Sequence, residues 1–303
     1  MSAASHDGRA PSNSVINLVV ALLCLIWGST WLVIKAGLRD LPPLTSASIR
    51  FTLAAVVFAL VVPRLRGLEG GTRPPAWMIL VMGLLNFAIP YGVVYVGETV
   101  IPSGLAAVLW AVFPIMMAVS SHFMLPGERL VAGHWVGFSL GFLGVVLLFF
   151  TDLRDIGPEA VAVGAFFLLS PFVSAIGNTL VKRYGESHSS LLLNRGGLAI
   201  AAAALWAGAL TTERGAALRW SGLAVFSIAY LAIVGTVVTF GLFYWLLRYA
   251  AAHRLSLIAY VIPAVALFLG WALGDEVVGV RTLAGAGLIL LGIGLVARSR
   301  ARS

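Results

Sequence analysis

Charged residues are scarce in this chain of 303 residues, and acidic residues are the scarcer kind. Charged residues make up 11% of the sequence, with 12 Asp and Glu in total, whereas soluble domains carry about 25% charged residues. A water-soluble fold could not cover the remaining apolar surface, because 60% of the residues are hydrophobic. The composition therefore excludes an ordinary soluble domain and indicates that most of the chain faces lipid or other helices within lipid.

Cysteine and the sequence signatures of several catalytic centres are also missing. The single cysteine, Cys24, cannot form an intramolecular disulfide. The sequence contains no HExxH zinc motif and no P-loop, and no pair of aspartates lies near the middle of an apolar run. We therefore expect a protein that is not an enzyme and that has no metal site and no cofactor. Its basic residues are scattered in short loops instead of forming a stripe, so nucleic acid is not an expected partner.

Apolar runs of the length that crosses a bilayer, about 20 residues, occupy most of the sequence. The first run is too long for the apolar region of a typical signal peptide, so we expect a retained helix. Residues 1–14 are polar and are expected to form a disordered cytoplasmic segment. The loops are too short to hold a soluble domain, so the sequence predicts an all-α membrane protein with ten transmembrane helices. The predicted spans are 15–35, 44–63, 76–97, 103–125, 131–150, 159–181, 190–211, 221–247, 255–273 and 279–297.

The distribution of basic residues predicts the orientation of these helices. With the amino terminus placed in the cytoplasm, twelve lysines and arginines fall on the cytoplasmic side and six on the other side. Arg50 and Arg195 lie in or near spans and are left out of this comparison. Cytoplasmic loops are enriched in Lys and Arg, so both termini, including the tail at 298–303, are expected in the cytoplasm.

The two halves of the sequence repeat one another. Glu128 and Glu276 occupy equivalent positions 148 residues apart, and Pro114 has a counterpart in Pro263. The same offset of 148 relates two further pairs, Gly137 with Gly285 and Gly144 with Gly292. We predict one repeat over 15–150 and a second over 159–297. Five spans per repeat is an odd number, so the repeats would cross the membrane in opposite senses and form a binding site between them.

Several short motifs, taken in order, resemble the drug/metabolite transporter superfamily in its EamA-domain branch. The first helix carries Trp27-Gly28-Ser29-Thr30-Trp31 followed by Lys35, and Arg50 lies at the start of the second span. The remaining motifs are Ser103 to Ala107 leading to Pro114, Gly127 to Leu130, Gly235-Thr236, Phe243 to Trp245, Ser256-Leu257 leading to Pro263, and Asp275-Glu276. The resemblance covers residues 14–297; it differs at Ser174, where the counterpart of Trp27 is expected, and at Asp275, the counterpart of Gly127.

The resemblance implies a multi-pass protein of the bacterial inner membrane that exports small metabolites. Amino acids, including aromatic ones, and their analogues are the substrates that it implies, and alternating access through a central cavity is the expected mechanism. The expected partners are a small-molecule substrate and the lipid bilayer, with the chain acting as a monomer or a homodimer. Phosphorylated sugars or nucleotide sugars are the alternative substrates, although such anions would require several cations deep in the cavity. An intramembrane enzyme is the less favoured alternative.

Aromatic and amide residues on spans one, three, four, six, eight and nine are the candidate substrate-binding residues, because these helices line the cavity in the resembled fold. Rings with a few hydroxyl and amide groups suit an amphipathic ligand, although Trp and Tyr are also common at membrane interfaces. Trp206, Trp220 and Trp271 are expected at the interfaces. The candidates are Trp27, Asn86, Tyr91, Tyr95, Trp110, Asn178, Phe240, Tyr244 and Tyr260.

Prolines and charged residues near the spans give further expectations. Pro114 and Pro263 are predicted to act as paired hinges, because proline removes a backbone donor and kinks a helix. Glu128 and Glu276 are expected to cap the helices that follow them, spans five and ten. Snorkelling to the interface is the favoured interpretation of Lys35, Lys182, Arg50 and Arg195, with gating or capture of a substrate carboxylate as the alternative. Transport is either uncoupled or coupled to protons through Glu98 or His122, and glycines on spans five and ten are expected to pack closely.

Overall fold

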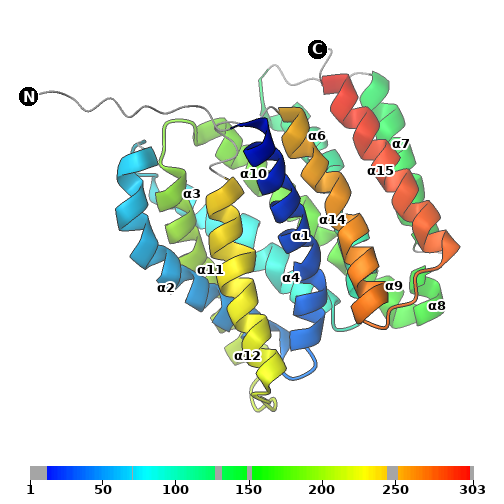
Figure 1. Ribbon diagram of the computed structural model, residues 1–303, viewed down its shortest axis with the longest axis horizontal. Coiled ribbons are helices and arrows are strands. Elements are labelled where there is room, and N and C mark those ends of the chain that lie inside the picture. The colour runs from blue at the N-terminus through cyan, green and yellow to red at the C-terminus, as the bar shows by residue number, and fades with distance from the viewer. Residues whose placement is uncertain (1–11, 70, 127–131, 149–151, 244–251, 301–303) are drawn as a thin grey trace, which may run out of the picture.

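The computed structural model describes residues 12–69, 71–126, 132–148, 152–243 and 252–300. These residues form a bundle of helices and, within the described ranges, no strand longer than an isolated bridge between Thr72 and His188. The start of α1 and the end of α15 lie at the same end of the bundle, the upper end in Figure 1. The helices of the first half are α1 (Asn13–Gly37), α2 (Pro43–Glu69), α3 (Ala76–Val81), η1 (Met82–Ala88), α4 (Ile89–Gly97), α5 (Ser103–Trp110), α6 (Phe113–Met124) and α7 (Ala132–Leu148).

The second half continues the all-helical architecture. Its helices are α8 (Arg154–Ile156), α9 (Pro158–Phe167), α10 (Leu169–Tyr184), α11 (Ser190–Thr212), α12 (Gly222–Ala229), η3 (Tyr230–Val238), α14 (Ala252–Leu273) and α15 (Val280–Arg300). The helix α1 begins at Asn13, so the last two residues of the segment predicted to be disordered are helical. Ser12 is the N-cap residue of α1. Residues 1–11, together with Glu128 and Tyr244, lie outside the described residues.

Within the described residues, seven helical stretches are long and apolar enough to cross a membrane. They are Asn13–Gly37, Pro43–Leu65, Ala76–Gly97, Ser103–Met124, Pro158–Tyr184, Ser190–Thr212 and Gly222–Phe243. Shorter apolar helices at Gly133–Leu148, Val261–Leu273 and Val280–Leu295 fall within three other predicted spans. The prediction of a multi-pass helical membrane protein is therefore confirmed.

Two π-helical segments occur at equivalent places in the two halves of the chain. The segment η1 starts at residue 82 and η3 starts at residue 230, which is the offset of 148 found in the sequence repeat. The segment η1 joins α3 to α4, and η3 follows α12 within the apolar stretch Gly222–Phe243. Such segments are rare and recur at functional sites, so the interior next to η1 and η3 is a natural place to look for a site.

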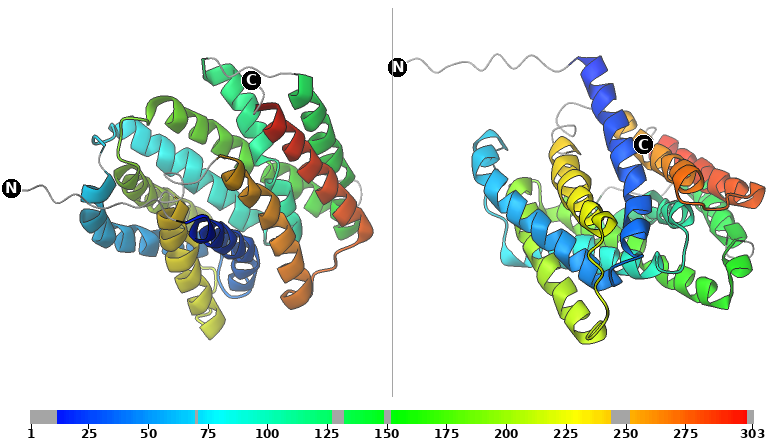
Figure 2. Two further views of the ribbon diagram at one scale, coloured as in Figure 1. Left: turned by 45° about the horizontal axis from the view of Figure 1, so that its top comes forward. Right: turned by 60° about the horizontal axis from the view of Figure 1, so that its bottom comes forward.

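Glycines allow α7 and α15 to pack with their backbones in close contact. A Cβ atom added at Gly144 would lie 2.7 Å from the carbonyl oxygen of Gly285, and one at Gly292 would lie 2.5 Å from that of Gly137. The two helices stay side by side in both views of Figure 2. The expected packing of the glycine-containing spans five and ten is confirmed, and small residues serve it because they let helix backbones approach.

The two candidate hinge prolines occupy different local structures. Pro114 follows a break at Ala111 and Val112 that separates α5 from α6. Pro263 instead lies inside α14, which is one helix from Ala252 to Leu273. A third proline, Pro63, also lies inside a helix, α2. Pro114 and Pro263 thus occupy matching positions in the sequence repeat but differ in backbone geometry.

Candidate functional site

An arginine without an acidic partner is buried at the centre of the bundle. Arg50 of α2 has 1% of its surface exposed. Its Nη1 donates a hydrogen bond to the Tyr95 hydroxyl at 3.3 Å, and its Nη2 and Nε donate to Thr236 Oγ1 at 3.2 and 3.4 Å. The guanidinium carbon lies 4.9 Å from the centre of the Tyr91 ring, within cation–π range. None of the Asp and Glu residues in the described ranges forms an ion pair with this guanidinium.

The burial of Arg50 shows that the snorkelling interpretation was wrong for this residue. The helix α2 begins at Pro43, so Arg50 lies about two turns inside it. Its side chain points to the interior, where Thr236 of the π segment η3 supplies an acceptor. Arg50 and Thr236 both belong to sequence motifs, but their spacing along the chain does not predict that they lie together. The one signal in the sequence is a single cation within an apolar run.

Aromatic rings extend from the arginine toward α1. The Tyr91 ring lies 4.9 Å from that of Phe51 and 6.5 Å from that of Phe87. Phe87 is 5.6 Å from Phe240, and Phe240 is 6.4 Å from Trp27. Three of the predicted site residues, Tyr91, Phe240 and Trp27, therefore belong to one continuous run of rings next to Arg50, and Tyr95 joins it through its hydrogen bond.

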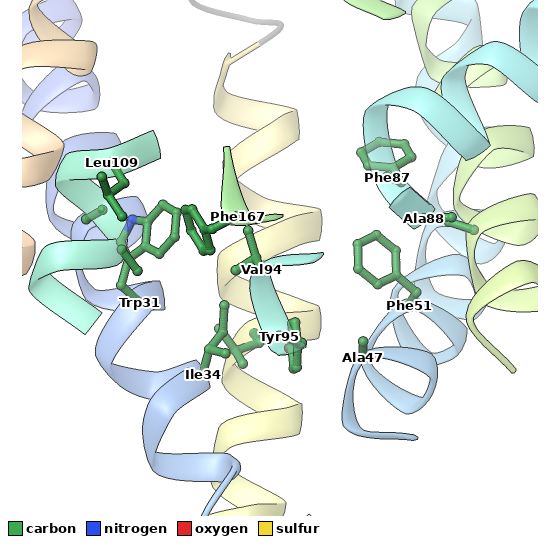
Figure 3. Packing of buried hydrophobic residues seen from close by; sticks show 14 of the residues in the cluster. Trp31, Ile34, Ala47, Phe51, Phe87, Ala88, Val94, Tyr95, Leu109 and Phe167 are labelled. Atoms are coloured by element: carbon green, nitrogen blue, oxygen red, sulfur yellow. The ribbon is translucent and has the colours of Figure 1, made fainter. Parts of the chain in front are cut away.

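A second group of predicted residues lies around Trp110. Its ring is 6.3 Å from that of Trp31, which in turn faces Phe167 in Figure 3. The indole Nε1 of Trp110 donates to Ser170 Oγ at 3.0 Å, and this hydroxyl donates to the carbonyl oxygen of Pro90 at 3.0 Å. The indole is thus fixed by a hydrogen bond that it donates to α10, and the same hydroxyl donates to a backbone carbonyl of α4.

The two predicted amides contact one another between η1 and α10. Asn178 Nδ2 donates to Asn86 Oδ1 at 2.6 Å and to the Ser174 carbonyl oxygen at 2.8 Å. Asn86 is 7% exposed, and its Nδ2 has no hydrogen-bond partner among the described residues. A buried donor without a partner is uncommon, so this amide can donate to a ligand. Of the remaining candidates, Tyr260 lies in α14 without a described side chain.

A large pocket, here named the vestibule, is lined by residues of α8 and of the ends of α1 and α14. Figure 1 shows these elements at the lower end of the bundle. The vestibule has a volume of about 880 Å³, and it lies among the end of α1, the α4–α5 loop, α8 and the turn between α14 and α15. None of the predicted substrate-binding residues lines it. Its charged lining residues are Lys35, Arg39, Glu98, Asp152, Asp155, Asp275, Glu276 and Arg281.

Carboxylates at this end cap helices from the other half of the chain. The two carboxylate oxygens of Glu276 accept hydrogen bonds from the backbone N–H groups of Ser103 at 2.6 Å and Gly104 at 2.9 Å. Glu213 accepts in the same way from the N–H groups of Leu44 and Thr45, both at 2.7 Å. The expectation that Glu276 caps the following helix was wrong, because it caps α5 instead.

Lys35 is also held by backbone groups. Its Nζ donates to the carbonyl oxygens of Glu98 at 2.6 Å and Ile101 at 3.2 Å, with Thr99 at 3.5 Å. The carbonyl groups of the α4–α5 loop therefore accept hydrogen bonds from the Lys35 ammonium. This contact lies close to the start of α5, which Glu276 caps. Lys35 does not point away from the protein as snorkelling would require.

Comparisons with known proteins give the family of this chain. The model of the EamA-like transporter family matches residues 14–150 and again 163–298. The uncharacterized transporter YoaV of Bacillus subtilis (strain 168) is 27% identical over 278 residues, 92% of this chain and 95% of that protein. The uncharacterized inner membrane transporter YedA of Escherichia coli (strain K12) is 30% identical over 277 residues, 90% of this chain and 88% of that protein.

Two further matches concern function and fold. A protein of Escherichia coli (strain K12) named as a probable amino-acid metabolite efflux pump is 28% identical over 293 residues, 91% of this chain and 92% of that protein. A protein solved as a crystal structure is 20% identical, with a TM-score of 0.66 over 96% of this chain and 99% of that chain. The latter match shows a shared fold over nearly the whole length.

Proposed function

This chain belongs to the EamA-like transporter family, and from that premise we propose that it exports amino acids and related small metabolites by alternating access. The family and its apolar helices make it an integral, multi-pass membrane transporter. The relative named as an amino-acid metabolite efflux pump supports the substrate class. The family and the names of the relatives also favour a transporter over an intramembrane enzyme.

The buried guanidinium of Arg50 is the observation that carries the proposed substrate class. A charge that is buried without a counter-ion is costly, and Arg50 is 1% exposed. A substrate carboxylate would neutralise this charge, and its two oxygens match the planar donors of arginine. The rings of Tyr91 and Phe240 beside it would accept an apolar or aromatic side chain.

The same observation disfavours phosphorylated or nucleotide sugars. Phosphate groups are recognised by several cations, whereas Arg50 is the one lysine or arginine in the buried part of the described chain. A single carboxylate is the better electrostatic match to a single buried guanidinium.

The proposed binding residues form two groups around the interior. We assign substrate contact to Trp27, Asn86, Tyr91, Tyr95, Trp110, Asn178, Phe240, Tyr244 and Tyr260, with Arg50 added. Pro114 and Pro263 remain the proposed hinges. The unpartnered Nδ2 of Asn86 supports this assignment, since a ligand oxygen could accept its hydrogen bond.

The proposed architecture is a pair of inverted five-helix repeats, 15–150 and 159–297, with all ten spans crossing the membrane. Matching π segments in the two halves support the repeat. The start of α1 and the end of α15 lie at the same end of the bundle (Figure 1), which supports an even number of crossings. We place both termini in the cytoplasm of a bacterial cell, the chain in the inner membrane, and the functional unit as a monomer or homodimer.

Efflux of preloaded amino acids from proteoliposomes tests this proposal. We expect Arg50→Met to lower efflux at least about tenfold, because hydrogen bonds to charged groups contribute about 1.5–3 kcal/mol. Trp110→Ala should also lower efflux, since it removes an indole held by Ser170. Trp271→Ala is the matched control, because that tryptophan is 61% exposed.

Folding of each variant is checked by its yield and by a single symmetric peak in size-exclusion chromatography. Normal efflux by folded Arg50→Met and Trp110→Ala would show that the site is wrong while the transporter class stands. Wild-type vesicles that retain every amino acid tested would contradict the substrate class itself.

A further inference from the structure

Glu98, which precedes the α4–α5 loop, is a buried acid whose side chain has no hydrogen-bond partner. It is the C-cap residue of α4 and has 0% of its surface exposed. Neither Oε1 nor Oε2 has a hydrogen-bond partner among the described residues. A carboxylate in this position would lack the donors that stabilise buried anions, whereas a protonated carboxyl is neutral and costs far less to bury.

The position of Glu98 gives a proton a route to water. The residue forms part of the wall of the 880 Å³ vestibule, so a small rearrangement of the loop would expose its carboxyl to that space. From this geometry we propose that Glu98 is the proton-binding residue of the transporter, protonated in this conformation and deprotonated when the α4–α5 loop moves. The proposal rests on the proposed transport function, because it assigns the coupling ion of that function.

The charges around Glu98 oppose one another. The ammonium of Lys35 and the guanidinium of Arg50 favour the anion, whereas the carboxylate of Glu276 disfavours it. Burial is the largest influence and raises the pKa of the Glu98 carboxyl well above its usual range. The other titratable or charged groups near it are Tyr95, whose hydroxyl lies on the same helix, and the vestibule residues Arg39, Asp152, Asp155, Asp275 and Arg281.

Glu276 does not compete for this role, because both of its oxygens already accept backbone N–H groups at the start of α5. The two acids therefore differ in their contacts: Glu276 caps α5 with both of its oxygens, whereas neither side-chain oxygen of Glu98 has a hydrogen-bond partner among the described residues.

Lys35 provides a link between the proton and the loop. Its Nζ bonds to the carbonyl oxygens of Glu98 and Ile101 while the Glu98 side chain stays unpaired. Deprotonation breaks the carboxyl O–H bond, passes the proton to vestibule water and leaves a carboxylate beside this ammonium. The ammonium then gains a charged partner and is drawn from the carbonyls, which releases the loop between α4 and α5.

Infrared titration of the substrate-free protein in lipid tests the proton site directly. We expect a protonated-carboxyl stretching band that disappears as pH rises, that is missing in Glu98→Gln, and that titrates at a shifted pH in Glu98→Asp. Asp155→Asn is the matched control, because Asp155 lines the same vestibule but is exposed; it should retain the band. A titrating band of wild-type size in Glu98→Gln would overturn the proposal.

The pH dependence of amino-acid efflux separates this proposal from the proposed function. If one proton-binding step limits transport, the wild-type rate changes by up to about tenfold per pH unit. We expect this dependence to persist in Asp155→Asn and to be lost in Glu98→Gln. The same pH profile in Glu98→Gln and wild type would overturn the proton site while the transport function stands. A band that depends on Glu98 in a protein that moves no amino acid would support the proton site and contradict the substrate class.

Discussion

Removing the carboxylate of Glu276 should destabilise the protein through a helix in the other half of the chain. Ser103 and Gly104 are the first residues of α5, and their N–H groups have no partner within the helix. The preceding residue, Pro102, forms no side-chain cap. Glu276 supplies both missing acceptors, at 2.6 and 2.9 Å, so its truncation leaves two backbone donors without a protein partner.

The expected magnitude follows from these two hydrogen bonds. A hydrogen bond to a charged group contributes about 1.5–3 kcal/mol, and loss of a cap costs about 0.5–2 kcal/mol. Glu276 is partly exposed, so water replaces part of the loss, and we expect Glu276→Ala to lower the free energy of unfolding by about 2 kcal/mol. Glu276→Gln should cost about half as much, because its amide keeps one acceptor.

Reversible unfolding in mixed detergent micelles at neutral pH measures this difference. Asp275→Asn is the control, because it removes the same charge from the same turn at an exposed position, and its effect should stay within about 0.5 kcal/mol. Equal unfolding free energies for Glu276→Ala and Asp275→Asn would refute the argument that Glu276 caps α5.

Two further predictions use the same unfolding measurement. Gly292→Ala should lower the free energy of unfolding by about 1–3 kcal/mol, since its Cβ would lie 2.5 Å from the backbone oxygen of Gly137. The control is Gly287→Ala on the same helix, whose Cβ meets nothing within 4 Å and which should be neutral or stabilising by up to about 1 kcal/mol. Equal effects of the two substitutions would show that α7 and α15 are not in backbone contact. Burial raises the pKa of the Glu98 carboxyl in the folded protein. Between the ordinary pKa and this raised pKa, the folded protein therefore binds more protons than the unfolded chain. The free energy of unfolding consequently falls as pH rises through the raised pKa. Glu98→Gln should remove that fall, and a variant that loses stability over the same pH range as wild type would contradict the assignment.

The membrane class and most of the helices could be predicted because they depend on local composition. A run of about 20 apolar residues has the length of a helix that crosses a bilayer, and such a helix satisfies its own backbone groups in lipid. The start of α1 at Asn13 and the end of the span at Gly97 fall within two residues of prediction. The glycines of α7 and α15 were also predictable in kind, because small residues at helical spacing serve close packing.

The site could be predicted only in part because its contacts join distant segments. Arg50 and Thr236 are 186 residues apart, and their contact depends on how α2 and η3 face each other. Glu276 accepts hydrogen bonds from the N–H groups of α5 and not from those of α15, although α15 follows Glu276 in the sequence. Spacing along the chain gave the chemistry of these residues, namely a cation and a helix cap, but not their partners.

The two carboxylate caps constrain how the proposed alternating access can proceed. Glu213 follows α11 and holds the start of α2, while Glu276 follows α14 and holds the start of α5. Each cap therefore joins helices from different halves of the chain, and the pairs α2–α11 and α5–α14 are also packed against each other. Two rigid bodies that coincide with the sequence halves could not separate at this end without breaking four charge-assisted hydrogen bonds to backbone N–H groups. A motion that keeps these pairs intact would cost less, so under the proposed mechanism the boundary between moving parts would run between the two capped pairs.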